Sequence, residues 1–220
     1  MSALVNPDDI HRRRTMDQRE CDLAVRKHEL FVLGRSGGQR ANFSYRNLTG
    51  LNLACKNLSE ADFTGAIMVE CDLSGTNLQR ALLFCANLTK AKMVRANLTR
   101  ADMRGAVLKG ADLTAAELFN ADLREGAIFT KRLASDLQGV TVDSDPTDMS
   151  RAKMVNANLS QANMSGAVAM MVDFTDAILK GANLAKANLK NATLEGADLE
   201  GADLSRADLR GAILRNANLY

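Results

Sequence analysis

Hydrophobic residues recur at every fifth position from Phe43 onward, and this period organises most of the chain. Seventeen consecutive five-residue segments run from the one centred on Phe43 to the one centred on Leu123, and fifteen more run from Met149 to Leu219. The period matches neither the roughly 3.6 residues of a helix turn nor the roughly 2.0 of a strand. It predicts short extended pieces joined by turns, with two of every five side chains pointing inward.

The inward positions repeat nearly the same pair of residues. The central residue is Leu, Met or Phe in thirty-one of the thirty-two segments, and Ala stands two positions earlier in twenty-five. Aromatic residues make up only 4% of the chain and Trp is absent, whereas a core of mixed shapes normally uses large aromatic side chains. We therefore predict an all-β solenoid in which identical layers stack in register. Its core is represented by the central leucines Leu73, Leu78, Leu88, Leu98, Leu113, Leu159, Leu184, Leu199 and Leu209.

Residues 1–40 lie outside the repeat and are predicted to form an α-helical cap. Asn6 and Pro7 followed by two acids are typical of a helix start, and glycines from Gly34 onward end the apolar stripe. We expect a helix from about Pro7 to Leu33, continuous or broken near Thr15. Such a helix would cover the first coil, because an uncovered end exposes core and unpaired backbone. Residues 41–220 then form the second unit.

The repeat is interrupted at about residues 125–147. The spacing from Leu123 to Phe129 is six, and the following residues fit the period poorly until Met149. We expect a bulge at residues 125–126 and a loop or distorted coil at about 130–147. Three acids of this region, Asp143, Asp145 and Asp148, lack the length and the Glu of a calcium loop, so no metal site is expected.

The phrase ADLEG at residues 197–201 and its neighbours resemble the pentapeptide-repeat family, whose consensus is A(D/N)LXX. Asp or Asn precedes the central residue in twenty-two segments, as that consensus requires. The resemblance implies a right-handed quadrilateral β-helix with four segments to each coil, the Leu and Ala inside. Nine such coils over residues 41–220, at a strand spacing of about 4.8 Å, would form a rod roughly 43 Å long.

The charged residues balance over the whole repeat region but not locally. Residues 41–220 contain twenty Lys or Arg and twenty Asp or Glu, whereas residues 76–110 alone carry a formal charge of +6. Side chains twenty residues apart should stack in a solenoid, which pairs Arg80 with Arg100 and Lys190 with Arg210. These columns form either a solvated rim or a site for phosphate groups or an acidic protein.

Several apolar residues occupy predicted outward positions, where solubility does not explain them. Apolar side chains that gather in a patch mark partner sites, whereas scattered ones carry no such meaning. The candidate partner surface comprises Phe84, Phe119, Met170 and Met171 together with Arg80, Arg100, Lys190 and Arg210.

Catalysis finds little support in the residues. The two histidines, His11 and His28, both fall in the predicted cap, so no Ser–His or Cys–His pair can form within the rod. No glycine-rich phosphate loop is present, and the four cysteines lack metal-binding spacing. No cofactor is therefore expected. Without a signal peptide or an apolar run of about 18 residues, the predicted location is the cytoplasm and no membrane span is expected.

The leading functional hypothesis is a non-enzymatic protein-interaction scaffold that presents flat β-helix faces to a protein partner of unknown identity. The alternative comes from one branch of the resembled family, whose members mimic DNA and modulate a type II topoisomerase such as gyrase; the near-neutral repeat disfavours it. Direct nucleic-acid binding is a third and weaker hypothesis. Because the pattern continues to Tyr220 with nothing to cover the last coil, the chain is either a fragment or a homodimer joined through its C-terminal coil.

Overall fold

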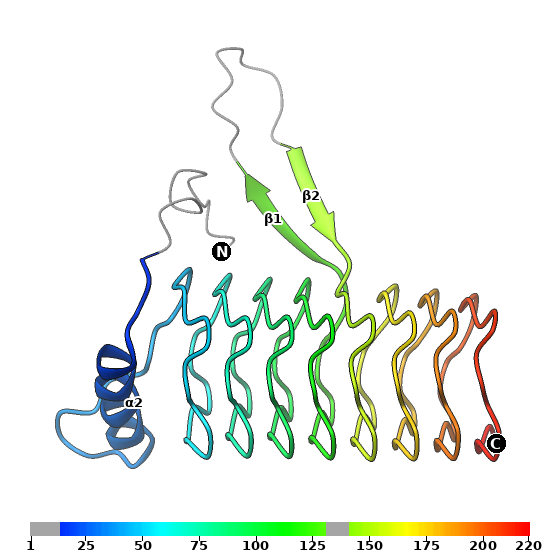
Figure 1. Cartoon of the computed structure of the whole chain (residues 1–220), viewed down its shortest axis with the longest axis horizontal. Helices are drawn as coiled ribbons and strands as arrows, with labels where there is room; N and C mark the ends of the chain where they lie inside the picture. Colours follow the sequence, from blue (N-terminus) through cyan, green and yellow to red (C-terminus); the bar gives the residue numbers. More distant parts are fainter. Residues whose placement is uncertain (1–13, 131–140) are drawn as a thin grey trace.

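A computed structural model describes residues 14–130 and 141–220 of the chain, and the repeat forms a stack of coils (Figure 1). Parallel bridges join residues that precede a central position in one coil to their equivalents in the next, most of them twenty positions later, as in Asn42 with Asp62. The bonds of that pair run from Phe43 N–H to the Asp62 carbonyl (2.7 Å) and from Asp62 N–H to the Ala41 carbonyl (3.1 Å). The chain is a right-handed quadrilateral β-helix, and the predicted fold is confirmed.

Where Asp or Asn precedes the central residue, its side chain closes the turn that follows. The Asn42 side chain accepts a hydrogen bond from Ser44 N–H (2.9 Å), and the same contact recurs along the stack. The next residue takes a left-handed conformation, as at Arg80 (φ 57°) and Gly65 (φ 61°). Glycine adopts this conformation without strain, whereas other residues need such local bonds. Each segment therefore turns by the same angle and the coil closes as a square.

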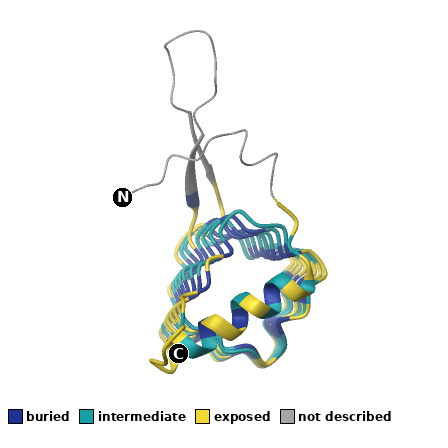
Figure 2. Cartoon of the chain, turned by 90° about the vertical axis from the view of Figure 1, so that its left-hand side faces the viewer, coloured by how far each residue is buried: buried dark blue, intermediate teal, exposed yellow. Residues whose placement is uncertain are grey.

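The interior is lined by the central residues and the small residues that precede them (Figure 2). We number the four faces in chain order from the segments centred on Phe43, Leu48, Leu53 and Leu58. Eight of the nine representative leucines are at most 2% exposed, namely Leu73, Leu78, Leu88, Leu98, Leu113, Leu159, Leu184 and Leu199. Leu209, in the last coil, is only partly buried.

The stack contains eight coils, not the expected nine. The four bridges from Val107–Asp148 to Asp122–Asn163 join residues forty-one apart, whereas the other bridges between coils join residues twenty apart. The twenty-one residues 126–146 therefore leave the stack, and thirty-two segments in groups of four remain. Eight layers give a rod of roughly 38 Å. Phe129, counted above as the start of a new register, lies outside the coils in a strand.

The departing residues begin and end as an antiparallel hairpin that projects from the rod (Figure 1). Strand β1 (Gly126–Thr130) pairs with β2 (Thr141–Asp145), starting at Gly126 with Asp145. The expected bulge at residues 125–126 is instead the root of this hairpin. Gly126 is required there, because a Cβ would lie 2.8 Å from the Arg104 carbonyl oxygen. The Thr147 hydroxyl donates to the Arg124 carbonyl (2.7 Å) and closes the gap.

Helix α2 (Gln18–Val32) lies across the opening of the first coil (Figure 2). Asp17 caps the helix, because its side chain accepts a hydrogen bond from Glu20 N–H. Cys21, Val25 and His28 form the buried face of the helix. Thr15, where a break was considered, is extended and pairs with Asn47. Helix α2 therefore begins after a break at Thr15, and residues 7–13 lie outside the described residues.

Candidate functional site

The residues of the candidate partner surface lie on three different faces of the rod. The bridges assign Phe84 to face 1; Met170, Met171, Lys190 and Arg210 to face 2; and Arg80, Arg100 and Phe119 to face 4. A flat partner surface can cover one face of a square rod. These residues therefore form separate clusters, which we consider face by face.

Phe84 on face 1 is half-buried under an arginine. The Arg104 guanidinium carbon lies 5.3 Å from the centre of the Phe84 ring, a cation–π contact that shields the ring from a partner. Asp102 accepts two bonds from the same guanidinium (2.8 and 2.7 Å). Arg124 binds Asp122 in the same way, and Arg104 lies 3.7 Å from Asp122. The charges of this ladder pair with one another. Face 1 therefore presents few unpaired charged groups to a partner near the hairpin root.

Met170 and Met171 on face 2 form the most accessible apolar cluster on a flat face. The Met171 side chain is 48% exposed, and Met170 beside it is half-buried. Lys190 lies one coil after Met170, and Asp208, one coil further on, lies 3.3 Å from Lys190 and accepts a hydrogen bond from Arg210 (2.7 Å). The hydrogen bond from Arg210 holds the pKa of Asp208 well below its usual range, although partial desolvation opposes it. The cluster is therefore bordered by two cations that share one acid.

The opposite border of the methionine cluster is also basic. Arg151 stacks one coil before Met171, since its N–H donates to the Met170 carbonyl (2.9 Å). Arg151 is exposed and makes no ion pair within the described residues. We call the group Arg151, Met170, Met171, Lys190 and Arg210 the methionine patch.

Face 4 carries the Arg80 and Arg100 column and an exposed phenylalanine. Arg80 N–H donates to the Thr99 carbonyl, which places Arg80 one coil before Arg100 as expected. The Arg80 side chain lies 3.6 Å from Glu60, so one of the two cations is paired. Phe119 follows one coil later and is 39% exposed. No second apolar side chain lies beside Phe119 at the same position of the adjacent coils, which carry Thr99 and Ser160.

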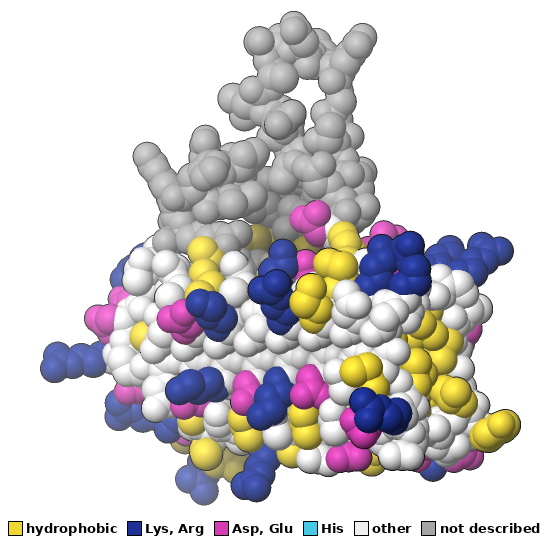
Figure 3. Space-filling model, turned by 45° about the vertical axis from the view of Figure 1, so that its right-hand side comes forward, with side chains coloured by type: hydrophobic (Ala, Val, Ile, Leu, Met, Phe, Trp, Pro, Cys, Tyr) yellow, Lys and Arg dark blue, Asp and Glu magenta, His cyan; other side chains and the backbone are white. Residues whose placement is uncertain are grey.

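The basic segment at residues 76–110 does not form a basic face. Its cations are distributed around the rod: Arg104 on face 1, Lys90 and Lys109 on face 2, Lys92 and Arg95 on face 3, Arg80 and Arg100 on face 4. Several pair with acids from other coils, such as Lys90 with Glu70 (3.6 Å) and Lys109 with Asp148 (3.0 Å). Opposite charges are interspersed on the face seen in Figure 3. The local excess of positive charge along the sequence is thus neutralised by acids from neighbouring coils.

The acidic, His and Cys side chains are dispersed over the part of the chain that the structure describes. Within it, no group of three acidic, His or Cys side chains could hold a metal ion. Burial raises the pKa of Cys21 to about 12 and that of Cys71 to about 11, so these thiols stay protonated at neutral pH. In the same residues, no helix combines the length and apolar character needed to cross a bilayer.

Sequence reasoning missed the flanks of α2. Leu23, Phe31 and Leu33 are 54%, 42% and 63% exposed, although the pattern had assigned them to the apolar stripe of the cap. Two grooves run beside the helix, one of about 210 Å³ and one of about 250 Å³. The spacing gave a signal for Leu23, which lies on the opposite side of the helix from the buried Cys21, Val25 and His28.

Comparison with known sequences explains the repeat. The sequence profile described as "Pentapeptide repeats" matches eight copies within residues 41–130 and 147–220. The chain belongs to the pentapeptide repeat family. The matched regions end at residue 130, the last residue of β1, and resume at residue 147, after β2. Among functionally curated proteins, none shows significant sequence similarity.

The chain is also similar to several proteins of solved structure. HetL, involved in heterocyst differentiation regulation in the cyanobacterium Nostoc sp. strain PCC 7120, is 28% identical over 86% of this chain and 92% of its own, with a TM-score of 0.32. Rfr23 from the cyanobacterium Cyanothece 51142 is 27% identical over 69% and 90%, with a TM-score of 0.39. QnrB1, a plasmid-mediated fluoroquinolone resistance protein, is 18% identical over 82% and 86%, with a TM-score of 0.45.

Proposed function

We propose that this pentapeptide repeat protein is a non-enzymatic scaffold that binds a protein partner through a flat face of its β-helix. The methionine patch carries the proposal, because it combines an exposed apolar centre with basic borders on one rigid face. Methionine adapts to varied partner surfaces, and a preformed face loses little entropy on binding. We propose that it acts in the cytoplasm, since its four cysteines are free.

Two properties of the surface favour a protein partner over the alternatives. A DNA mimic needs a strongly acidic surface to occupy a basic groove, yet Lys or Arg side chains occur on all four faces. Nucleic-acid binding needs a continuous basic stripe, yet the cations are paired or dispersed. The family's topoisomerase-binding branch therefore remains an outcome to be tested rather than the favoured function.

The test compares two charge insertions at apolar side chains of similar exposure. Met171 is 48% exposed in the patch, and Ile178 on face 4 is 40% exposed outside it. In affinity capture from a native lysate, Met171→Asp should lose proteins that the wild type retains, while Ile178→Asp should keep them. Equal recovery with both variants would refute the patch. Potent inhibition in a gyrase supercoiling assay would instead favour the DNA mimic.

We also propose self-association through the last coil. Leu204, Leu209 and Leu214 point inward there but are only partly buried, and Leu219 is 53% exposed. Equivalent leucines elsewhere are at most 2% exposed. A second copy stacked on this end would bury these side chains and pair the open backbone edge.

A further inference from the structure

The first coil has no coil before it, so its outward backbone edge needs other partners. On face 2, Met16 N–H donates to the Asn47 carbonyl (3.0 Å) and Asn47 N–H to the Arg14 carbonyl (3.3 Å), so residues 14–16 act as an added strand. On face 3, the Gln18 side-chain amide accepts from Asn52 N–H (2.9 Å) and donates to the Asn52 carbonyl (2.8 Å). Residues 14–18 of the chain thus pair the outer backbone edge of the first coil on two of its four faces.

The edges of faces 1 and 4 stay open. Asn42 and Asn57 hold the positions equivalent to Asn47 and Asn52, and their backbone N–H and C=O groups have no hydrogen-bond partner among the described residues. One coil later, Asp62 uses both groups to pair with the first coil. Asn42 therefore presents a donor and an acceptor in the geometry that binds a neighbouring strand.

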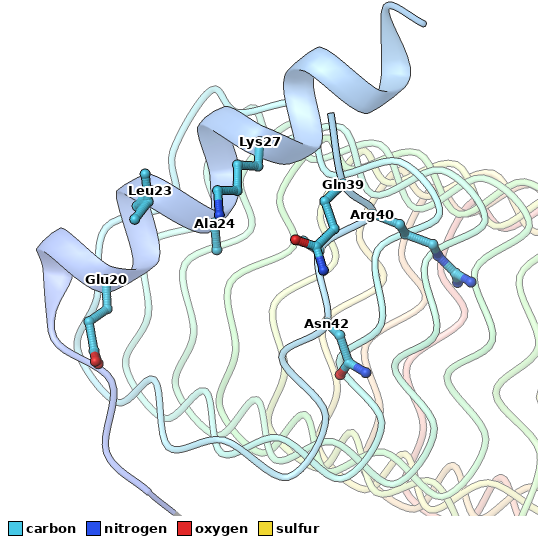
Figure 4. Close-up of a pocket in the computed structure, with 8 residues that line it drawn as sticks. Glu20, Leu23, Ala24, Lys27, Gln39, Arg40 and Asn42 are labelled. Atoms are coloured by element: carbon cyan, nitrogen blue, oxygen red, sulfur yellow. The ribbon is translucent and has the colours of Figure 1, made fainter. Parts of the chain in front are cut away.

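A groove runs alongside the open edge at Asn42. Its volume is about 210 Å³, and one wall is the extended segment of residues 39–42. The other wall is the α2 face formed by Glu20, Leu23, Ala24 and Lys27, at the spacing that brings residues together on one side of a helix. Figure 4 shows the helix beside the extended segment. We call this the Asn42 groove; a helix next to a free strand edge is an arrangement that binds extended peptides as an added strand.

The side chains of the Asn42 groove are basic with an apolar wall. Lys27 is exposed and makes no ion pair within the described residues, and Arg40 on the opposite wall donates its Nε–H to the Glu60 carbonyl, which fixes the guanidinium. The one acid, Glu20, is engaged by Arg14. Leu23, 54% exposed, provides the apolar contact. The groove is therefore complementary to an acidic segment with alternating apolar side chains.

We propose that the Asn42 groove binds an extended acidic segment of a protein partner as an added β-strand. The Asn42 backbone pairs with the segment, a carboxylate of the segment faces Lys27, and an apolar side chain packs on Leu23. The groove on the other side of α2 has no such preference, because Asp22 and Glu29 oppose Arg26 and Lys56 there. The proposal rests on the proposed protein-binding function, but it uses a surface separate from the methionine patch.

The binding test uses the full chain and a fluorescent peptide of sequence VDVDVDV. Fluorescence anisotropy should show saturable binding, and hydrogen exchange should show new protection of the Asn42 amide. Asn42→Pro removes an N–H that bonds to nothing in the described structure and should weaken binding about tenfold. The matched Asn57→Pro variant, at the other open edge, should bind as the wild type does. Wild-type affinity in Asn42→Pro, its folding checked by thermal melting, would overturn the proposal.

The charge test uses Lys27→Glu with Arg26→Glu as its control. Lys27→Glu should weaken VDVDVDV binding roughly fivefold at low salt, whereas Arg26→Glu, in the other groove, should not change it. The peptide VKVKVKV should bind more weakly than VDVDVDV, and equal binding would refute the charge preference. If VDVDVDV binds to a variant that lacks residues 1–13 but not to the full chain, the groove is filled by the chain's own N-terminal segment and the proposal is overturned. Met171→Asp should leave peptide binding unchanged, so the two functional tests fail independently.

Discussion

At the scale of the residue, the interior accepts a polar side chain only where a carbonyl receives its hydrogen. Thr76 replaces Ala and its hydroxyl donates to the Leu53 carbonyl (2.7 Å), and Cys71 donates to the Leu48 carbonyl (2.8 Å). Buried polar groups are almost always bonded in this way. Departures from the consensus are therefore tolerated without opening the stack. The small central residue Ala169 is followed by the larger Val172, which keeps that layer filled.

A pair of leucines tests the dependence on layer position. Leu98 is completely buried between coils, whereas Leu209 in the last coil is partly exposed. Leu98→Ala should lower the free energy of unfolding by about 3 kcal/mol, because it leaves a cavity that close packing cannot fill. Leu209→Ala should cost roughly half as much. Urea denaturation followed by circular dichroism measures both, and equal losses would show that the last coil is covered in solution.

At the scale of the element, the cap depends on one neutral histidine. His28 is buried, and its Nδ1 accepts from Ala41 N–H (3.0 Å) at the start of the first coil. Its Nε2 has no hydrogen-bond partner in the described structure. Burial, with a smaller effect of Arg40, lowers the pKa of His28, against the opposing influence of Ser59, Glu29 and Glu60. A protonated His28 would lose the Ala41 bond, so α2 is held by the neutral form.

This arrangement predicts that the cap loosens in mild acid. A folded-state pKa below the unfolded value of about 6.5 means that the His28 contribution is complete above that pH and is lost as the pH falls toward the lowered pKa. Hydrogen exchange of the α2 amides, corrected for the intrinsic rate, should become faster between pH 7.5 and 5.5. His28→Gln, which keeps an acceptor but does not titrate, should show no such change. Carboxylates with lowered pKa values, such as Asp72, titrate below this window.

Elements were predictable where they follow the period and less so where they leave it. Thr147 is the clearest example, because the sequence shows a Thr at an Ala position and nothing more. In the structure its hydroxyl bridges the Arg124 carbonyl and Gly105 N–H (3.0 Å), which ties the root of the hairpin to two coils. The spacing around residues 125–147 indicated an interruption, but a hairpin and a distorted coil of the same length fit it equally well.

At the scale of the whole molecule, the partly exposed leucines of the last coil predict a dimer. Two copies joined at these ends would elute from size-exclusion chromatography with the mass of a dimer by light scattering, about 48 kDa from the 23.8 kDa chain. Leu214→Asp should shift the protein to the monomer mass, because it places a charge in the shared interior. Leu23→Asp, an exposed change at the opposite end, should leave the dimer intact. A wild type that is monomeric at high concentration would refute the interface.

The five-residue period determined the architecture, the inward side chains and the turn-closing Asp or Asn, because each depends on contacts within a segment or on a fixed separation of twenty residues. Only the tertiary structure decided which surface residues lie together. It divided Phe84, Phe119 and Met171 among three faces and neutralised the basic segment with acids from neighbouring coils. It also left the backbone N–H and C=O of Asn42, beside α2, without a hydrogen-bond partner among the described residues. Those relations depend on how the hairpin shifts the register and where the cap helix crosses the square, and neither is encoded in the repeat.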